Sequence, residues 1–231
     1  MAYSARQKLL AAVRPSEWRV VGRKVLNRLQ PEHRDEAEAW AAANAEPVDA
    51  FAAGLDADLW AEATAWEDEF RTAVRARREA GELGTVPMGG PGDFRLVYFL
   101  TRHLRPTVVL ETGVAAGFTS AAILVAIERN GAGTLFSSDL PYMGSAEARA
   151  EVGRVVEPRL RKGWNLALGG DRANLAEFLP RMSHVDLLHY DSDKSSAGRK
   201  YALDEVAWQH WRGDRIAQER FYYDPAQRKP E

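Results

Sequence analysis

The chain has 231 residues, of which 45% are hydrophobic and 28% charged, as is typical of an ordinary globular protein rather than a disordered or fibrous one. Its 31 Lys and Arg are balanced by 33 Asp and Glu, and a net charge of −2 provides no overall positive field for a nucleic acid. The absence of cysteine excludes disulfides, thiolate catalysis and cysteine-ligated metal sites. No apolar run reaches the roughly 18 residues of a membrane helix. We therefore expect a cytoplasmic protein without a membrane span or a nucleic-acid partner.

The first part of the sequence, residues 1–83, has the composition of a helical region. Alanine, the best helix former, is frequent there, and three prolines stand where helices are expected to begin: Pro15, Pro31 and Pro47. Apolar residues recur at mostly three- and four-residue steps, which predicts one amphipathic helix over 56–78. We expect this region to pack through its apolar face as a cap on the rest of the chain. A substrate lid or a dimer element is the alternative.

From Gly92 onward, helical segments alternate with short apolar runs. Helices are expected over 94–104, 119–129, 146–156, 175–179 and 197–210, and strands over 107–110, 133–138, 164–168 and 185–190. Because the connections between strands are too long for hairpins, this alternation predicts parallel βαβ units. The expected fold class is therefore α/β, with a doubly wound, Rossmann-like, mostly parallel sheet.

The first of these strands ends in a glycine turn. Ligands of a doubly wound sheet bind beyond the carboxyl ends of the strands, where the strand order reverses. Gly113 and Gly117 let a ligand approach the backbone, and the following helix offers its free N–H groups at the same place. The turn is not the dinucleotide-binding GxGxxG, because Ala115 occupies the position of the middle glycine, and the sequence has no GK[ST] phosphate loop. A nicotinamide or nucleoside triphosphate ligand is thus disfavoured.

Two carboxylates accompany the glycine turn. Asp139 ends the second strand, where it can accept both hydroxyls of a ribose. Glu111 lies at the start of the turn, where its charge would repel a pyrophosphate and attract an ammonium or sulfonium group. Together they favour a cationic nucleoside. Each also has a structural alternative, because Glu111 could cap the following helix and Asp139 could initiate the turn at Pro141.

A third polar group, Asp191-Ser-Asp193-Lys194, follows the fourth strand, so its side chains are expected at the mouth of the same cleft. Carboxylates suit a hard cation such as Mg²⁺, and a lysine beside such a cation can have a lowered pKa and act as a general base. The structural alternative is a helix N-cap formed by Asp193 or Ser195. His189, at a buried position of the strand, is interpreted as a hydrogen-bonded core residue rather than a ligand.

Four stretches together resemble class I S-adenosylmethionine-dependent methyltransferases, most of all the small O-methyltransferases of the catechol and caffeoyl-CoA type and their sugar-modifying bacterial relatives. These stretches are Pro87-Met-Gly-Gly-Pro-Gly-Asp-Phe94, Val109-Leu-Glu-Thr-Gly-Val-Ala-Ala-Gly-Phe-Thr-Ser120, Phe136-Ser-Ser-Asp139 and Tyr190-Asp-Ser-Asp-Lys194. The resemblance spans a domain over 84–210, and the glycine turn is its most specific part. It implies S-adenosylmethionine as the cofactor and a small-molecule hydroxyl as the methyl acceptor.

The resemblance also implies, position by position, which residues bind the cofactor. Glu111 and the two glycines would surround its methionine part, Asp139 would bind its ribose, and Gly170-Asp171 would lie against its adenine. Met88 and Gly89 would close over it. The full set of cofactor-binding residues is Met88, Gly89, Glu111, Gly113, Ala115, Gly117, Thr119, Ser120, Asp139, Gly170, Asp171 and Asp191.

After the fourth strand, the resemblance implies the residues of catalysis. The first Asp of the family's motif is a metal ligand and its Lys is the base, which here correspond to Asp191 and Lys194. We therefore expect both to be catalytic, with Asp191 and Asp193 as ligands of Mg²⁺.

The end of the sequence departs from the family pattern. Family members continue with a fifth strand, usually preceded by Pro-Gly-Gly and followed by Asp-Asp or Asp-Asn, whereas residues 211–231 contain a single residue, Ile216, from the set Val, Ile, Leu and Met. A buried parallel strand needs several such residues. We expect a polar tail over 211–231 with at most a short edge segment at 221–223, and thus an incomplete C-terminal half of the sheet. The open edge of the fourth strand would favour a homodimer, aggregation or covering by the N-terminal helices.

This departure leaves two hypotheses of function. In the first, the chain is an active O-methyltransferase in which a substrate hydroxyl attacks the sulfonium methyl in line, while Lys194 or Asp191 aids its deprotonation. In the second, it is a noncatalytic cofactor-binding or interaction protein that has lost the strands and metal ligands needed for turnover. The sequence predicts neither the substrate nor the methyl-accepting atom.

Overall fold

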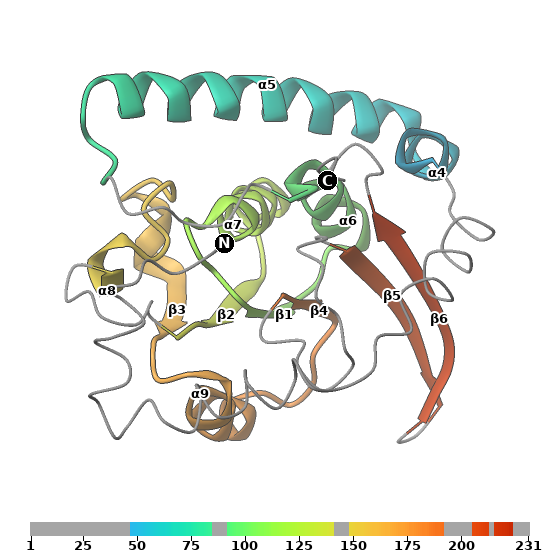
Figure 1. Cartoon of the computed structure of the whole chain (residues 1–231). Helices are drawn as coiled ribbons and strands as arrows, with labels where there is room; N and C mark the ends of the chain where they lie inside the picture. The colour runs from blue at the N-terminus through green and yellow to red at the C-terminus, as the bar shows by residue number, and fades with distance from the viewer. Residues whose placement is uncertain (1–46, 85–91, 141–147, 192–204, 213–214, 224–231) are drawn as a thin grey trace, which may run out of the picture.

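A four-stranded parallel sheet forms the centre of the structure, a computed structural model that describes residues 47–84, 92–140, 148–191, 205–212 and 215–223 (Figure 1). Its strands are β1 (Val108–Thr112), β2 (Thr134–Ser138), β3 (Trp164–Ala167) and β4 (Leu187–Tyr190), in the order β3-β2-β1-β4. The predicted α/β fold with a parallel, Rossmann-like sheet is confirmed. The strand order reverses between β1 and β4, so the carboxyl end of β1 is the expected place for a ligand.

Helices on both faces bury the two central strands. Val109 of β1 pairs with Leu135 of β2, and both face the larger apolar core with α6 (Phe94–Leu104) and α7 (Phe118–Asn130). The next pair, Leu110 and Phe136, faces the opposite side and packs with Phe178 of α9 (Asp171–Phe178). Alternate residues of a strand point to opposite faces, so burial on both faces explains the continuous apolar runs in the sequence.

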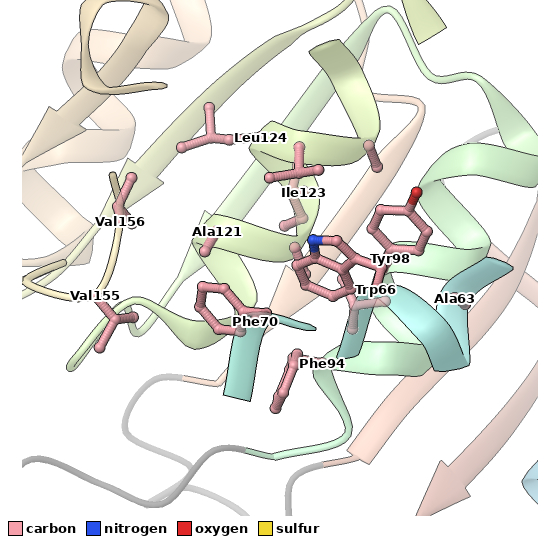
Figure 2. Packing of buried hydrophobic residues seen from close by; sticks show 14 of the residues in the cluster. Ala63, Trp66, Phe70, Phe94, Tyr98, Ala121, Ile123, Leu124, Val155 and Val156 are labelled. Carbon is pink, nitrogen blue, oxygen red and sulfur yellow. The ribbon is translucent and has the colours of Figure 1, made fainter. Parts of the chain in front are cut away.

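The N-terminal helices pack on α6 and α7 through an aromatic stripe. Their bounds are α4 (Val48–Leu55), which begins directly after Pro47 as expected, and α5 (Ala57–Glu79). Trp66 of α5 stacks on Tyr98 of α6 with ring centroids 4.4 Å apart, and Phe70 contacts Phe94 edge-on at 5.6 Å (Figure 2). The amphipathic helix predicted over 56–78 is therefore present, and its apolar face is core. Residues 1–46, which include Pro15 and Pro31, lie outside the described residues.

The helix expected over 146–156 is much shorter than predicted. The structure has α8 (Ala148–Glu151), and the chain then leaves the helical path because Gly153 adopts a left-handed backbone with φ 70°. Two short 3₁₀ segments follow, η2 (Leu160–Gly163) before β3 and η3 (Leu179–Arg181) after α9.

The C-terminal part forms a hairpin that the sequence analysis did not expect. The helix predicted over 197–210 is wrong from residue 205, where β5 (Glu205–Arg212) begins, and β6 spans Arg215–Tyr223 rather than a short segment at 221–223. The two strands pair antiparallel in a sheet of their own, with Arg212 opposite Arg215. Gly213-Asp214 between two alternating aromatic and polar runs is the sequence signal for such a hairpin.

The hairpin does not extend the parallel sheet. Within the described residues, β4 pairs with β1 alone and no fifth parallel strand is present, which agrees with the expected incomplete C-terminal half. Residues 192–204 and 224–231 lie outside the described part. No helix of that part has both the length and the apolar character needed to cross a membrane.

Candidate functional site

The turn from β1 into α7 is built from left-handed backbone. Gly113, Ala115 and Gly117 have φ values of 83°, 48° and 91°, a region that glycine adopts without cost and other residues rarely adopt. The Gly113 N–H donates to the Ser138 carbonyl at 2.9 Å, which ties the beginning of the turn to the end of β2. Gly117 is the N-cap residue of α7, so the turn ends where the free N–H groups of that helix begin.

The carboxylate of Asp139 holds this turn from the neighbouring strand end. Its Oδ2 accepts from the Val114 and Ala115 N–H groups at 3.0 and 2.7 Å, and its Oδ1 accepts from Leu140 N–H at 2.6 Å. Burial raises the pKa of Asp139 above its ordinary value, while these three amides stabilise the charged form. The structure thus brings together the glycine turn and the acidic strand end that the sequence analysis paired.

Glu111 lies beneath the turn and is completely buried. Its Oε2 accepts from the hydroxyls of Ser120 on α7 and Ser137 on β2, at 2.7 and 2.6 Å, and Trp164 Nε1 in turn donates to the Ser137 hydroxyl at 2.7 Å. Neither oxygen of Glu111 accepts from a backbone N–H of α7 within the described residues, so Glu111 does not cap that helix. The carboxylate instead joins β1, β2 and α7 beneath the turn.

The second oxygen of Glu111 is less well satisfied. Its Oε1 has no hydrogen-bond partner within the described part of the chain, and His189 Nδ1 lies 4.0 Å from it. Burial raises the pKa of Glu111 to about 7, and the charges of Asp139 and Asp191 raise it as well, although the serine hydroxyls oppose the shift. Near neutral pH, protonated and ionised Glu111 are therefore both populated.

A second polar network lies at the ends of β2 and β3, around Asn174 of α9. The Asn174 amide donates to the Ser138 hydroxyl at 2.8 Å and accepts from Gly169 N–H at 2.9 Å, and Ser138 donates to Asp171 Oδ1 at 2.7 Å. Asn174 is buried and holds Gly169 and the Gly170-Asp171 pair beside β2. Sequence analysis missed Asn174 because the sequence pattern of a short polar helix does not indicate whether a single Asn in it is buried or exposed.

At the end of β4, the Asp191 N–H donates to the Thr112 carbonyl at 2.8 Å, which places Asp191 beside the start of the glycine turn. His189 is buried opposite Glu111 in the strand register, in agreement with its interpretation as a core residue. Among the described residues, no group of three or more His, Asp or Glu side chains could hold a metal ion. The expected Mg²⁺ site is therefore not supported.

The residues expected at the site fall into three groups. Those with partly exposed positions around the strand ends are Gly113, Ala115, Thr119, Asp139, Gly170, Asp171 and Asp191. Those buried beneath the turn are Glu111, Gly117 and Ser120. Those outside the described residues are Met88, Gly89, Asp193 and Lys194. The first group can meet a ligand directly, whereas the second can only shape or charge the turn from below.

Comparison with known proteins gives one family match. Residues 110–214 match the family model of a methyltransferase domain, over a little less than half of the chain. The resemblance to methyltransferases is thereby confirmed for the part of the chain that carries the glycine turn and the strand ends. No curated protein matches the chain.

Two of the solved structures that are similar to parts of the chain are methyltransferases. One is an O-methyltransferase from Bacillus cereus in complex with SAH, with 12% sequence identity, a TM-score of 0.36 and coverage of 60% of this chain and 64% of that one. The other is the SAH-bound methyltransferase PaMTH1 from Podospora anserina, with 19% identity, a TM-score of 0.35 and coverage of 72% of this chain and 61% of that one. The chain thus spans less than two thirds of either protein.

Proposed function

We propose that this chain, whose residues 110–214 match the methyltransferase domain family, binds S-adenosylmethionine at the carboxyl ends of β1, β2 and β3 and methylates a hydroxyl of a small molecule. The observation that carries the proposal is the junction of Asp139 with the glycine turn, where a partly exposed carboxylate lies against bare backbone. A carboxylate in that position suits a ribose, and Gly113, which is partly exposed and has no side chain, leaves room for the rest of the ligand.

The residues around this junction suit the parts of the cofactor. Asp139 would accept the ribose hydroxyls, and the Gly113–Ala115 backbone would lie beside the methionine part. Gly170-Asp171 would lie against the adenine, where Leu140, 51% exposed and close to Gly170, offers apolar surface to a flat base. Glu111 would act from below, because its ionised form favours a cation at the turn.

S-adenosylmethionine, when bound, supplies an electrophilic methyl group on a positively charged sulfur. The protein must then orient the acceptor hydroxyl in line with that methyl group and receive its proton. Asp191, whose N–H donates to the Thr112 carbonyl at the start of the glycine turn, would contact such an acceptor, and Lys194 is the base expected from the sequence. Asp191 is the one described residue of the expected Mg²⁺ ligands, and we assign no step to a metal ion.

A second candidate function is a noncatalytic protein that retains the cofactor site. The observation that favours it is the C-terminal hairpin, which follows β4 in the sequence at the point where methyltransferases have further parallel strands. The hairpin forms a sheet of its own, so β4 is an edge strand within the described residues. Both candidates bind S-adenosylmethionine in the cytoplasm, and the β4 edge would suit a homodimer in either case. Transfer of a labelled methyl group to a panel of hydroxyl compounds separates them, because only the first candidate forms a methylated product.

Substitution of Asp139 by Ala tests the cofactor site. We expect the affinity for SAH, measured by isothermal titration with and without Mg²⁺, to fall by about 1.5–3 kcal/mol, because hydrogen bonds to a charged group are lost both to the ribose and to the turn. The matched control is Asp186→Ala. Asp186 accepts from the Thr107 N–H and hydroxyl at the opposite end of the sheet, at 2.8 and 2.7 Å, so its loss should lower stability and leave the affinity unchanged. Equal affinity of the Asp139→Ala variant and the wild type would contradict this assignment.

A further inference from the structure

The chain immediately after α8 supports the glycine turn from the side. Residues 152–156, here called the supporting segment, donate two backbone hydrogen bonds to the turn, from Gly153 N–H to the Ala115 carbonyl at 2.9 Å and from Val155 N–H to the Ala116 carbonyl at 3.0 Å. A Cβ placed on Gly117 would lie 2.7 Å from the Cα of Gly153. The turn and the segment are therefore in direct backbone contact, and the position of one fixes the position of the other.

Two arginines hold the carbonyl groups of the supporting segment. Arg161 donates to the Gly153 carbonyl at 2.7 Å and to that of Val156 at 3.2 Å. Arg77 donates to the Val155 carbonyl at 3.0 Å and to that of Arg154 at 3.2 Å. Burial, together with the charge of Arg77, lowers the pKa of Arg161 from its ordinary value. Four carbonyl dipoles on one short segment offset the repulsion between these two cations.

Arg77 comes from a different part of the chain than Arg161. It lies in the last turn of α5, which belongs to the N-terminal helical region. The C-terminal end of α5 lies above the chain between α8 and β3 (Figure 1). Most of α5 packs through apolar side chains such as Trp66 and Phe70, whereas Arg77 makes directional contacts. A second link joins the same parts, since Arg154 Nη1 donates to the Gly84 carbonyl at 2.6 Å, just after α5.

We propose that Arg77 is a positioning residue for the cofactor site, through which the N-terminal helical region holds the glycine turn in its binding conformation. The inference rests on the proposed function, and it assigns a role in cofactor binding to a region none of whose described residues belongs to the proposed site. Arg77 fixes the supporting segment by its carbonyl groups, and the segment fixes the turn by its N–H groups. Loss of the guanidinium frees the segment and lets the turn leave the conformation that binds.

The test compares Arg77→Met with Arg78→Met in the full chain. Arg78 is the next residue of α5 and is exposed, so its substitution removes the same charge from the same helix without touching the supporting segment. We expect Arg77→Met to weaken SAH binding about tenfold, which is close to the contribution of one hydrogen bond from a charged donor. Arg78→Met should bind as the wild type does. Arg77→Lys, which keeps the charge and one donor point, should recover part of the loss.

Amide hydrogen exchange provides a readout that does not depend on cofactor binding. In Arg77→Met, the Gly153 and Val155 amides should exchange at least several-fold faster, while amides of the β1–β2 ladder stay at the rate of global unfolding. Wild-type exchange rates at both amides, or equal SAH affinity of the two Met variants, would overturn the inference. If Arg77→Met does not fold, unchanged SAH affinity of Arg77→Lys would overturn it instead. Failure of the wild type to bind SAH would overturn the proposed function, and faster exchange in Arg77→Met would still establish the structural link.

Discussion

Between pH 4.5 and pH 8, the free energy of unfolding of the wild type is expected to fall by about 3 kcal/mol because of Glu111, and Glu111→Gln is expected to abolish this fall. Burial raises the pKa of Glu111 from 4.5 to about 7 in the folded protein, and each pKa unit corresponds to about 1.4 kcal/mol. Below pH 4.5 the group is protonated in both states, so the folded state keeps its full stability. Between pH 4.5 and about 7 the unfolded chain releases this proton while the folded protein keeps it, so the free energy of unfolding falls. Above this range both states are ionised and the loss is complete.

Urea unfolding at pH 5 and pH 8 measures this effect. From pH 5 to pH 8 the wild type should lose about 2–3 kcal/mol more in the free energy of unfolding than Glu111→Gln, because the neutral amide has no charge to bury. Glu69→Gln on the exposed face of α5 is the control, and its pH profile should follow that of the wild type. Parallel profiles for Glu111→Gln and the wild type would show that the Glu111 charge is compensated in the fold.

The sequence predicts the sheet and the glycine turn well because both depend on local patterns. The run Val108–Leu110 is apolar because helices cover both faces of β1, and Gly113 and Gly117 mark positions that require left-handed backbone. The bounds of α6 are also predictable, because Asp93 caps its N-terminus and Pro106 follows its C-terminus.

The surroundings of Glu111 depend on tertiary structure and are not predictable in the same way. The sequence places a carboxylate at a strand end and suggests contact with a ligand. Its partners Ser120 and Ser137 come from a helix and a neighbouring strand, and only the register that sets Glu111 opposite Ser137 brings them together beneath the turn. A serine has no pattern that distinguishes a buried partner from a surface residue.

The chain after α8 was mispredicted for a related reason. Residues 146–156 contain enough alanine and valine to suggest a helix, but Gly153 and Val155 donate to the glycine turn instead of to helical carbonyls. Backbone bonds between distant segments compete with local helix propensity, and the tertiary contact prevails here. The hairpin strands β5 and β6 replace the end of the helix expected over 197–210 and part of the polar tail expected over 211–231. The expectation of a tail counted only aliphatic residues, although aromatic residues also favour strands.

Gly117→Ala is expected to lower the free energy of unfolding by about 3 kcal/mol and to weaken SAH binding. Gly117 has φ 91°, and left-handed backbone costs a residue with a Cβ about 1–2 kcal/mol. The added Cβ would also lie 2.7 Å from the Cα of Gly153, so either the turn or the supporting segment must move, at a further cost of about 1–3 kcal/mol. The movement displaces the backbone that the cofactor is proposed to contact.

Gly131→Ala separates these two costs within the same helix. Gly131 ends α7 with φ 75°, and a Cβ there would have no atom within 4 Å, so its substitution carries the backbone cost alone. We expect Gly131→Ala to lose about 1–2 kcal/mol in urea unfolding and to bind SAH as the wild type does. The excess loss in Gly117→Ala then measures the close approach of the supporting segment to the turn. If both variants lost the same free energy of unfolding, the supporting segment would move away from the added Cβ at no cost. Its contacts with the turn would then be too weak to position a cofactor.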